Sequence, residues 1–294
     1  MSRAITALAL VLALALAACG PSRQNAVVVG SKNFPEQLIL GELIAQQIEA
    51  RTRLKVERRF YLAGTYICQQ AMLAGRIDVY PEYTGTALTA ILKEPPLKDP
   101  RAVFEKVKQE YAQKFHFAVL PSFGFNDTFA IEIRGADARR LHLTTISQAA
   151  KYTPRWRAGF GYEFMERADG YKGLVAAYGL KFAKPPLIMD LGLLDRALVN
   201  KQIDLAAGNS TDGLIPVLDL AILQDDKHYF PPYYAVPIVR EQALARHPEV
   251  RAALAGLAGK ISDQDMRALN YAVDGQHRSV ADVVREFRRK KGLN

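Results

Sequence analysis

The sequence predicts an α/β fold built from two similar lobes, and three observations lead to this prediction. Apolar strand-like runs and segments with helical periodicity alternate from residue 27 onward, which is typical of a sheet covered by helices. The alternation starts again after residue 157, so the second half resembles the first. Two matching segments, Ile77-Asp78-Val79 and Ile203-Asp204-Leu205, each follow a predicted helix.

The first half has the order strand, helix, strand, helix, strand. The predicted elements are a strand at 27–30, a helix through 40–48, a strand at 54–58, a helix at 64–73 and a strand at 77–80. Ligands of such sheets lie beyond the carboxyl ends of the strands. Residues 31–34 and 80–86 fall at these ends, so we expect them to face a ligand.

The second half repeats the pattern and then returns to the first lobe. The predicted elements are strands at 117–120, 128–133, 157–160, 187–189 and 203–208 and helices at 171–178 and 193–199. After residue 237 the chain is predicted to be helical, with a capping box at Ser262 and Asp265 and a last helix over 280–290. We expect two crossings between the lobes, near Phe125-Asn126 and Pro231-Pro232, and a hinged cleft that suits a small ligand.

One segment predicts the kind of ligand, namely Asp78-Val79-Tyr80-Pro81-Glu82-Tyr83-Thr84-Gly85-Thr86. A Thr or Gly ahead of the helix-period stretch 87–92 would leave backbone N–H groups free for an anion. Tyrosine rings beside them suit a cation. The segment therefore predicts a pocket for a small zwitterion.

The N-terminus is predicted to be the signal of a lipoprotein. Arg3 precedes an apolar run over 4–18, which suits a signal core better than a membrane-spanning helix. Leu16-Ala17-Ala18-Cys19 is similar to the lipobox of bacterial lipoproteins, in which the Cys is acylated. We expect residues 1–18 to be removed, Cys19 to carry lipid and residues 19–26 to form a tether. A plain secretory signal is the alternative.

Composition argues against several classes of function. The net charge is +9, but the basic residues are scattered and lack any nucleic-acid-binding motif, so we expect a solvated basic surface and no nucleic acid. The five histidines have no metal-binding spacing, and neither a metal nor a cofactor is expected. Cys68 is expected to be a buried small hydrophobe. No nucleophile–base pair is evident, so an enzyme is not expected.

Several motifs, in this order along the chain, strongly resemble one family. They are Gly30-Ser31-Lys32-Asn33-Phe34, Glu36-Gln37, Tyr80-Pro81-Glu82-Tyr83-Thr84-Gly85-Thr86, Asp169-Gly170-Tyr171 and Ser210-Thr211-Asp212-Gly213. The resemblance is to the osmoprotectant-binding proteins of ABC importers, which bind glycine betaine, choline, carnitine or proline betaine. It implies a type II periplasmic-binding-protein (Venus flytrap) fold with two inter-lobe crossovers and no catalysis. Lobe one would comprise 27–126 and 232–294, and lobe two 127–231.

The resemblance also implies ligand-binding residues in both lobes. Lys32, Tyr83 and Thr86 match binding positions of lobe one. Asp127 matches an acidic position of lobe two near the ligand's cation, and Arg167 is similar to the family's carboxylate-binding arginine. A trimethylammonium group has no N–H to donate, so aromatic faces and a nearby carboxylate recognise it. The ligand's own carboxylate would suit an arginine, a lysine or backbone N–H groups.

The aromatic cage departs from the family pattern at two positions. Tyr233 matches a cage tyrosine, but Phe129 stands where the family usually has another. Asn209 stands where a further aromatic residue is expected, and it offers no ring. The predicted cage therefore has three rings, from Tyr83, Phe129 and Tyr233. This form resembles a subgroup poorly suited to tight glycine betaine binding.

Some of these residues also have a purely structural interpretation. Tyr80 could be a packed strand-end residue, Arg167 a solvated helix residue and Asp212 a turn or helix cap. Trp156 could be a core or surface anchor. These interpretations make different predictions about burial and about what each side chain touches.

The leading functional interpretation is a solute-binding lipoprotein outside the cytoplasm, either periplasmic or at the cell surface. It would be a monomer that binds a quaternary ammonium osmoprotectant of the glycine betaine or choline type and delivers it to permease and ATPase subunits. The alternative is the same fold with a larger betaine-like zwitterion, such as a histidine betaine, and weak or no glycine betaine affinity. A receptor or scaffold that no longer takes part in transport is a third possibility.

Overall fold

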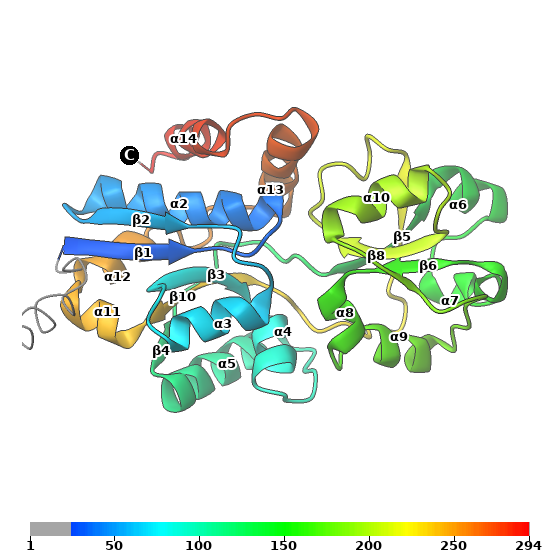
Figure 1. The fold of residues 1–294 in the computed structure, drawn as a ribbon, viewed down its shortest axis with the longest axis horizontal. Coiled ribbons are helices and arrows are strands. Elements are labelled where there is room, and N and C mark those ends of the chain that lie inside the picture. Colours follow the sequence, from blue (N-terminus) through cyan, green and yellow to red (C-terminus); the bar gives the residue numbers. More distant parts are fainter. Residues whose placement is uncertain (1–24, 294) are drawn as a thin grey trace, which may run out of the picture.

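Residues 25–293, which the computed structural model describes, form two α/β lobes joined by two crossing segments (Figure 1). The predicted signal peptide, Cys19 and most of the predicted tether lie outside the described residues. Within this described part of the chain, no helix has both the length and the apolar character needed to cross a membrane.

Lobe one is built around a five-stranded sheet with the order β2-β1-β3-β10-β4. Its strands are β1 (Ala26–Gly30), β2 (Lys55–Arg59), β3 (Val79–Tyr83), β4 (Phe117–Val119) and β10 (Ala235–Arg240). Its helices are α2 (Pro35–Arg51), α3 (Thr65–Leu73), α4 (Thr84–Thr86), α5 (Pro100–Phe115), α11 (Glu241–Arg246), α12 (Glu249–Ala255), α13 (Asp263–Asn270) and α14 (Val280–Lys290). β1 is parallel to β2 and β3, whereas β10 is antiparallel to β3 and β4.

Lobe two has a second five-stranded sheet, with the order β7-β6-β8-β5-β9. Its strands are β5 (Phe129–Arg134), β6 (Ala158–Phe160), β7 (Leu187–Ile188), β8 (Leu205–Asn209) and β9 (Leu220–Leu223). Its helices are α6 (Gly135–Leu141), α7 (Ile146–Ala149), η3 (Thr153–Arg155), α8 (Tyr162–Glu166), α9 (Tyr171–Tyr178) and α10 (Leu191–Val199). β5 is antiparallel to both of its neighbours.

The two sheets follow the same plan. One antiparallel strand in each sheet, β10 between β3 and β4 or β5 between β8 and β9, is the first strand to follow a crossing from the other lobe. The prediction of two similar α/β lobes is therefore confirmed. The carboxyl ends of the parallel strands in each lobe point toward the other lobe (Figure 1). Ligands of such sheets lie beyond these strand ends, so we expect a ligand between the lobes.

The two crossing segments run side by side and antiparallel. Asn126 and Tyr234 form an isolated bridge between them. The amide of Tyr233 donates to Asn126 Oδ1 at 2.6 Å, and the amide of Asp127 donates to the Tyr233 carbonyl at 3.1 Å. Residues predicted to bind ligand therefore sit at the junction of the lobes.

Helix α2 forms much of the core of lobe one. Pro35 occupies its first turn, where a missing N–H costs nothing. Its apolar side chains pack between the sheet and the C-terminal helices, and five of them are at most 1% exposed: Ile39, Leu40, Leu43, Ile44 and Ile48. Each such burial contributes about 1.5–3 kcal/mol relative to exposure. The helix thus holds its N-terminal residues firmly against the cleft.

Several sequence predictions need correction. The chain is not helical directly after residue 237, because Ala235–Arg240 forms β10 between β3 and β4. The helix-period stretch after Thr86 is a π-helix over Ala87–Ile91. Helix α5, capped by Asp99, and strand β9 were not predicted.

Two local predictions are confirmed. Ser262 and Asp265 form the expected capping box at the start of α13. Cys68 is fully buried and unpaired, and burial raises the pKa of its thiol to about 12. Cys68 is therefore a packing residue with little thiolate at neutral pH.

Candidate ligand-binding site

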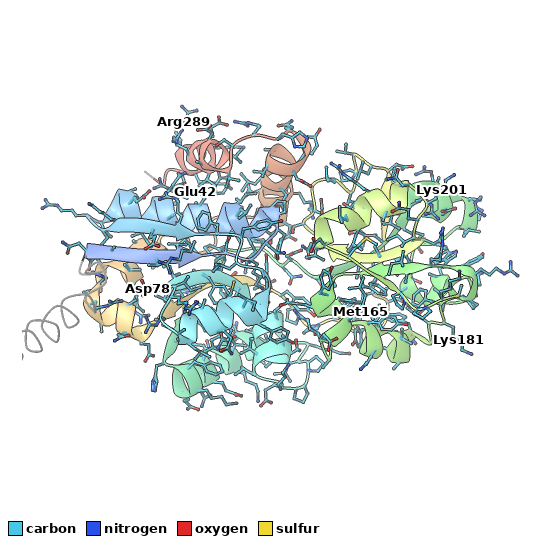
Figure 2. All side chains as sticks on the ribbon, in the orientation of Figure 1. Glu42, Asp78, Met165, Lys181, Lys201 and Arg289 are labelled. Carbon is cyan, nitrogen blue, oxygen red and sulfur yellow. The ribbon has the colours of Figure 1, made fainter. Side chains whose placement is uncertain are left out.

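A cavity of about 380 Å³ lies between the lobes and is lined from both of them. Side chains from both lobes reach into the space between the two sheets (Figure 2). All eight residues predicted from the resemblance line this cavity: Lys32, Tyr83, Thr86, Asp127, Phe129, Arg167, Asn209 and Tyr233. The fold therefore gathers into one place residues that are spread over most of the chain.

Lys32 and Tyr83 stand at the carboxyl ends of β1 and β3. Lys32 Nζ forms an ion pair with Glu82 Oε1 at 2.5 Å, and both side chains are buried. The same ammonium lies 4.9 Å from the centroid of the Tyr83 ring. The Tyr83 hydroxyl donates to Glu36 Oε1 at 2.7 Å. Lys32 is thus neutralised by the protein, and its charge is not free to hold an anion alone.

The backbone at the start of α4 does not present all the free N–H groups expected there. The amide of Thr84 donates to the carbonyl of Tyr234 at 3.0 Å, so it joins the crossing segment instead of facing a ligand. Gly85 allows this close approach, since a Cβ at that position would lie 2.6 Å from the Tyr233 ring. The segment positions Tyr233 and does not form an anion cradle at Thr84.

Asp127 is a buried acidic residue of the cavity for which the described residues provide no ion-pair partner. It accepts hydrogen bonds from the amide of Thr211 at 3.3 Å and the hydroxyl of Ser210 at 3.4 Å. No Lys, Arg or His among residues 25–293 forms an ion pair with it, and it is only 7% exposed. Burial, and then the charge of Glu36, raise the pKa of Asp127 well above its usual range. A cation placed beside it would compensate its charge.

Arg167 is buried in the wall of the cavity beside the Phe129 and Tyr233 rings and is held by Asp169. Its Nε and Nη2 donate to the two carboxylate oxygens of Asp169 at 2.9 and 2.6 Å. Its Nη1 donates to Thr86 Oγ1 across the cleft at 3.0 Å. Burial alone would lower the pKa of Arg167, but Asp169 outweighs this effect and raises it. The interpretation of Arg167 as a solvated helix residue is wrong, because it is 5% exposed.

Asp169 collects hydrogen bonds from both lobes. It accepts from the hydroxyls of Tyr233 at 2.5 Å and Thr89 at 2.8 Å, in addition to Arg167. Burial would raise the pKa of Asp169, but the hydrogen bonds and charge of Arg167 outweigh it, and the pKa is lowered. An ionised Asp169 therefore ties together the two sides of the cleft.

The aromatic walls of the cavity pack edge to face. The Phe129 ring is T-shaped against Tyr233 at 5.4 Å and against Phe164 at 4.8 Å. The Arg167 guanidinium carbon lies 5.0 Å from the Phe129 centroid and 5.7 Å from that of Tyr233. Asn209 faces Phe129 directly across the β5–β8 ladder, so its side chain shares the face of the Phe129 ring. The rings and the arginine form one packed wall.

Several cavity residues were not predicted from the sequence. They include two more aromatic side chains, Tyr162 and Phe164, together with Glu163 and Met189, whereas Phe34 belongs to the segment 31–34 that was expected to face a ligand. Glu163 reaches the N-terminus of α3 in the other lobe, where the amide of Tyr66 donates to its Oε1 at 3.4 Å. Gly64 makes room for it, since a Cβ there would lie 2.2 Å from that oxygen. The sequence signal for the unpredicted residues was their position just after β6 and β7, at strand ends.

Three structural interpretations can now be assessed. Tyr80 is a fully buried core residue whose hydroxyl donates to Glu82, and it is not among the residues that line the cavity. Asp212 accepts from the amide of Leu214 at 2.8 Å and stabilises a turn. Trp156 stacks on Tyr152 with ring centroids 6.0 Å apart, at the edge of the core of lobe two.

Comparison with known proteins shows which family the chain resembles. Residues 25–290 match the family OpuAC, described as the substrate binding domain of ABC-type glycine betaine transport system. The carnitine transport binding protein OpuCC of Listeria monocytogenes is 37% identical over 273 residues, which cover 92% of this chain and 88% of that protein.

Two further similarities concern other ligands and the fold. The ergothioneine transport permease/ergothioneine binding protein EgtU of Helicobacter pylori is 33% identical over 271 residues, which cover 92% of this chain but only 48% of that protein. A crystal structure of a glycine betaine/carnitine/choline ABC transporter is 34% identical, with a TM-score of 0.75 and coverage of 91% of this chain and 99% of that one.

Proposed function

The chain belongs to the family of substrate-binding domains of ABC-type glycine betaine transport systems, and from this premise we propose that it captures one quaternary ammonium zwitterion in the cavity between its lobes and delivers it to a permease. As a member of this family it is a substrate-binding protein of an ABC importer for ligands of the glycine betaine, carnitine or ergothioneine type. It acts outside the cytoplasm and is not an enzyme.

The observation that carries the proposal is the pairing of Asp127 with aromatic rings in one cavity. Asp127 is a buried carboxylate without a protein cation, and the Tyr83, Phe129 and Tyr233 rings line the same space. A trimethylammonium group offers a fixed charge and no N–H, so a carboxylate and π-faces recognise it. A desolvated cation–π contact is worth about 2 kcal/mol.

The carboxylate of the ligand is proposed to meet Arg167. A guanidinium has five N–H donors, and the protein contacts of Arg167 comprise two bonds to Asp169, one to Thr86 and a long one to Thr89 at 3.4 Å. One Nη1 donor therefore stays available toward the cavity. On this proposal the carboxylate of the ligand lies at Arg167 and its cation at Asp127, while Thr86 and Lys32 contact the ligand from lobe one.

A larger betaine is the second candidate, and two observations favour it. The cavity volume of about 380 Å³ equals that of about a dozen water molecules at about 30 Å³ each, so glycine betaine would leave much of it to water. Asn209 also leaves space where a ring would close the cage around a small cation. Carnitine and ergothioneine, named for two relatives, are both bulkier trimethylammonium zwitterions.

Calorimetric titration of the mature protein with glycine betaine, choline, carnitine and ergothioneine tests the proposal. Binding of at least one compound with a one-to-one stoichiometry is expected, and the order of affinities separates the two candidates. Tight binding of glycine betaine would favour the leading candidate, whereas preference for carnitine or ergothioneine would favour the second. Binding of none of them would contradict the proposed ligand class.

Asn209→Tyr is expected to change the affinity in opposite directions for the two candidates. The new ring would stand directly across from Phe129 and add a wall to the cage. If the ligand is glycine betaine, the affinity should rise by more than about tenfold, since one desolvated cation–π contact is worth about 2 kcal/mol. If the ligand is larger, the ring should fill its space and abolish binding. Titration of this variant against the same four compounds distinguishes these results, and an unchanged affinity would contradict both.

The lipid anchor at Cys19 remains a proposal, supported by the Leu16-Ala17-Ala18-Cys19 motif. Cys19→Ala is expected to move the protein from the membrane fraction to the soluble fraction, or to leave it unprocessed. Multiple acyl chains hold a protein firmly, whereas one chain binds only marginally. Fractionation and the intact mass of the purified protein measure the effect. An unchanged mass and membrane fraction would exclude the anchor.

The lobe boundaries that we propose are 27–126 with 232–294 for lobe one and 127–231 for lobe two. The membership of the two sheets and the paired crossing segments support them. We propose that closure about the Asn126–Tyr234 bridge makes the contacts between the lobes that are present in this structure, such as Arg167 with Thr86 and Glu163 with Tyr66 of α3. We propose that the protein works as a monomer with the permease and ATPase subunits of its importer.

A further inference from the structure

Glu36 lies behind the cavity, where it joins three parts of the chain. It is 2% exposed and stands in the first turn of α2. It accepts hydrogen bonds from the hydroxyl of Tyr83 at 2.7 Å, the hydroxyl of Thr211 at 2.5 Å and the amide nitrogen of Asn270 at 3.0 Å. Glu36 is not among the residues that line the cavity, so its carboxylate acts on a ligand only through its neighbours.

Thr211 links Glu36 to Asp127 across the cleft. Its hydroxyl donates to Glu36 Oε2, while its amide donates to Asp127 Oδ1 at 3.3 Å. Two buried carboxyl groups, one from each lobe, therefore share one threonine. Neither has an ion-pair partner in the part of the chain that the structure describes.

The other charged and titratable groups near this pair do not neutralise it. Tyr83 faces Glu36 with a neutral hydroxyl, since burial raises its pKa well above the usual value. Asp212 on the adjoining turn adds a further acidic group, whose pKa burial raises to about 7. Lys32 is paired with Glu82, and Arg267 of α13 donates to the backbone of Ser210 instead. Two ionised carboxylates in one buried site repel each other, so the doubly ionised state has a high free energy.

We propose that Glu36 is a positioning residue that sets the charge of the cation site: in the empty protein Glu36 and Asp127 hold one proton between them, and a quaternary ammonium ligand displaces that proton into water. The inference rests on the proposed function. The step balances, since the ligand brings one fixed positive charge and one proton leaves. Burial raises the pKa of both groups, and the charge of Glu36 raises the pKa of Asp127 further, which supports proton retention in the empty state.

The pH dependence of ligand affinity follows from this exchange. The bound cation favours the doubly ionised pair, so binding lowers the apparent pKa of the pair and releases a proton. Below the apparent pKa of the empty protein, affinity should rise by about tenfold per pH unit, and above it affinity should become constant. Choline and glycine betaine carry permanent cations, so the pH dependence of their affinity reports titration of the protein and not of the ligand.

Titration calorimetry in two buffers of different ionisation enthalpy counts the released protons. The wild-type protein is expected to release about one proton per bound molecule of choline, glycine betaine, carnitine or ergothioneine at pH values below the apparent pKa of the empty pair. Glu36→Gln keeps the shape and removes one titratable group with its charge, so the pKa of Asp127 should fall, and both the pH slope of the affinity and the proton release should be smaller than in the wild type. Glu42→Gln is the matched control: the same substitution on the same helix, at a buried residue paired with Arg58 away from the cavity.

A second measurement needs no ligand and keeps the inference separate from the proposed function. Carbon-13 NMR of the carboxyl groups in the empty wild-type protein should show that one group of the pair stays protonated at pH values well above the usual range for a carboxyl group. The titration of this group should depend on the protonation of the other. Ordinary titration of both groups would overturn the inference, even if Glu36→Gln failed to fold. Ligand binding without proton release, or an unchanged pH slope in Glu36→Gln, would also overturn it. If none of the compounds binds, the proposed function fails while the NMR titration still decides the pair.

Discussion

Asp169→Asn is expected to lower the free energy of unfolding by about 3–5 kcal/mol, because it leaves the buried guanidinium of Arg167 without its counter-ion. The side chains of this ion pair are 4% and 0% exposed, so water cannot replace the lost charge. Asparagine keeps the shape of the side chain and can still accept a hydrogen bond. The loss therefore measures the charge, not a cavity.

The same change at an exposed ion pair is the matched control. Arg139 and Asp219 also form a close pair, in which Nη1 and Nη2 of the arginine donate to the two carboxylate oxygens, but their side chains are 67% and 61% exposed. Asp219→Asn is therefore expected to change the stability by at most about 1 kcal/mol. Asparagine also suits the positive φ of 49° at this position. Denaturant unfolding of both variants gives the comparison.

The effect of Asp169 should depend on pH in a defined direction. Its pKa is lowered in the folded protein, so its stabilisation is fully present above the unfolded value of about 3.9 and is lost as the pH falls toward the lowered folded value. The difference in stability between wild type and Asp169→Asn should thus be constant near neutral pH and shrink below about pH 4. Equal losses at Asp169 and Asp219, or a difference that grows in acid, would contradict this account.

The charges deep in the cavity explain why a zwitterion with a fixed cation suits it. Lys32 is compensated by Glu82, and Arg167 is compensated by Asp169. Asp127, backed by Glu36, is left without a cation from the protein. The cavity thus has an acidic residue without an ion pair, Asp127, and a spare N–H donor, on Arg167, which match the two charges of a betaine and disfavour a simple anion.

Sequence reasoning predicted the lobes well because their signals are local. Apolar runs such as 27–30 and the glycine after a helix at Gly75 depend on nearby residues only. β10 was missed because Ala235–Arg240 is a short apolar run next to prolines, and such a run cannot be told from a buried helix by periodicity alone. Its identity as a strand depends on pairing with β3, far earlier in the chain.

The roles of two acidic residues could not have been derived from the sequence. Asp169 and Glu36 both stood in motifs that carried the resemblance, but neither was assigned a function. The Asp169 carboxylate is bound by Thr89, 80 residues earlier, and by Tyr233, 64 residues later. Glu36 meets Thr211, 175 residues away. Such contacts form only when the lobes come together, so no local sequence pattern predicts them.

Tyr233→Ala is expected to weaken ligand binding by more than tenfold. The ring is 2% exposed, packs against Phe129 and forms a wall of the cage. Its loss removes a desolvated cation–π contact of about 2 kcal/mol. It also removes the hydroxyl that donates to Asp169 and leaves a cavity, so the free energy of unfolding should fall by about 3–5 kcal/mol. Calorimetric titration and denaturant unfolding measure the two effects.

Two control variants separate binding from stability in this experiment. Tyr233→Phe keeps the ring and loses only the hydroxyl, while Asp169 retains Arg167 and Thr89 as donors, so its affinity should stay within about threefold of wild type. Tyr111→Ala removes a fully buried ring that packs against Phe115 and Phe117 in the core of lobe one, at a residue that does not line the cavity. It should lose about as much stability as Tyr233→Ala without a change in affinity. If Tyr111→Ala weakened binding as much as Tyr233→Ala, the loss would reflect general destabilisation. If Tyr233→Ala left the affinity for all four compounds unchanged, the cage would lie elsewhere.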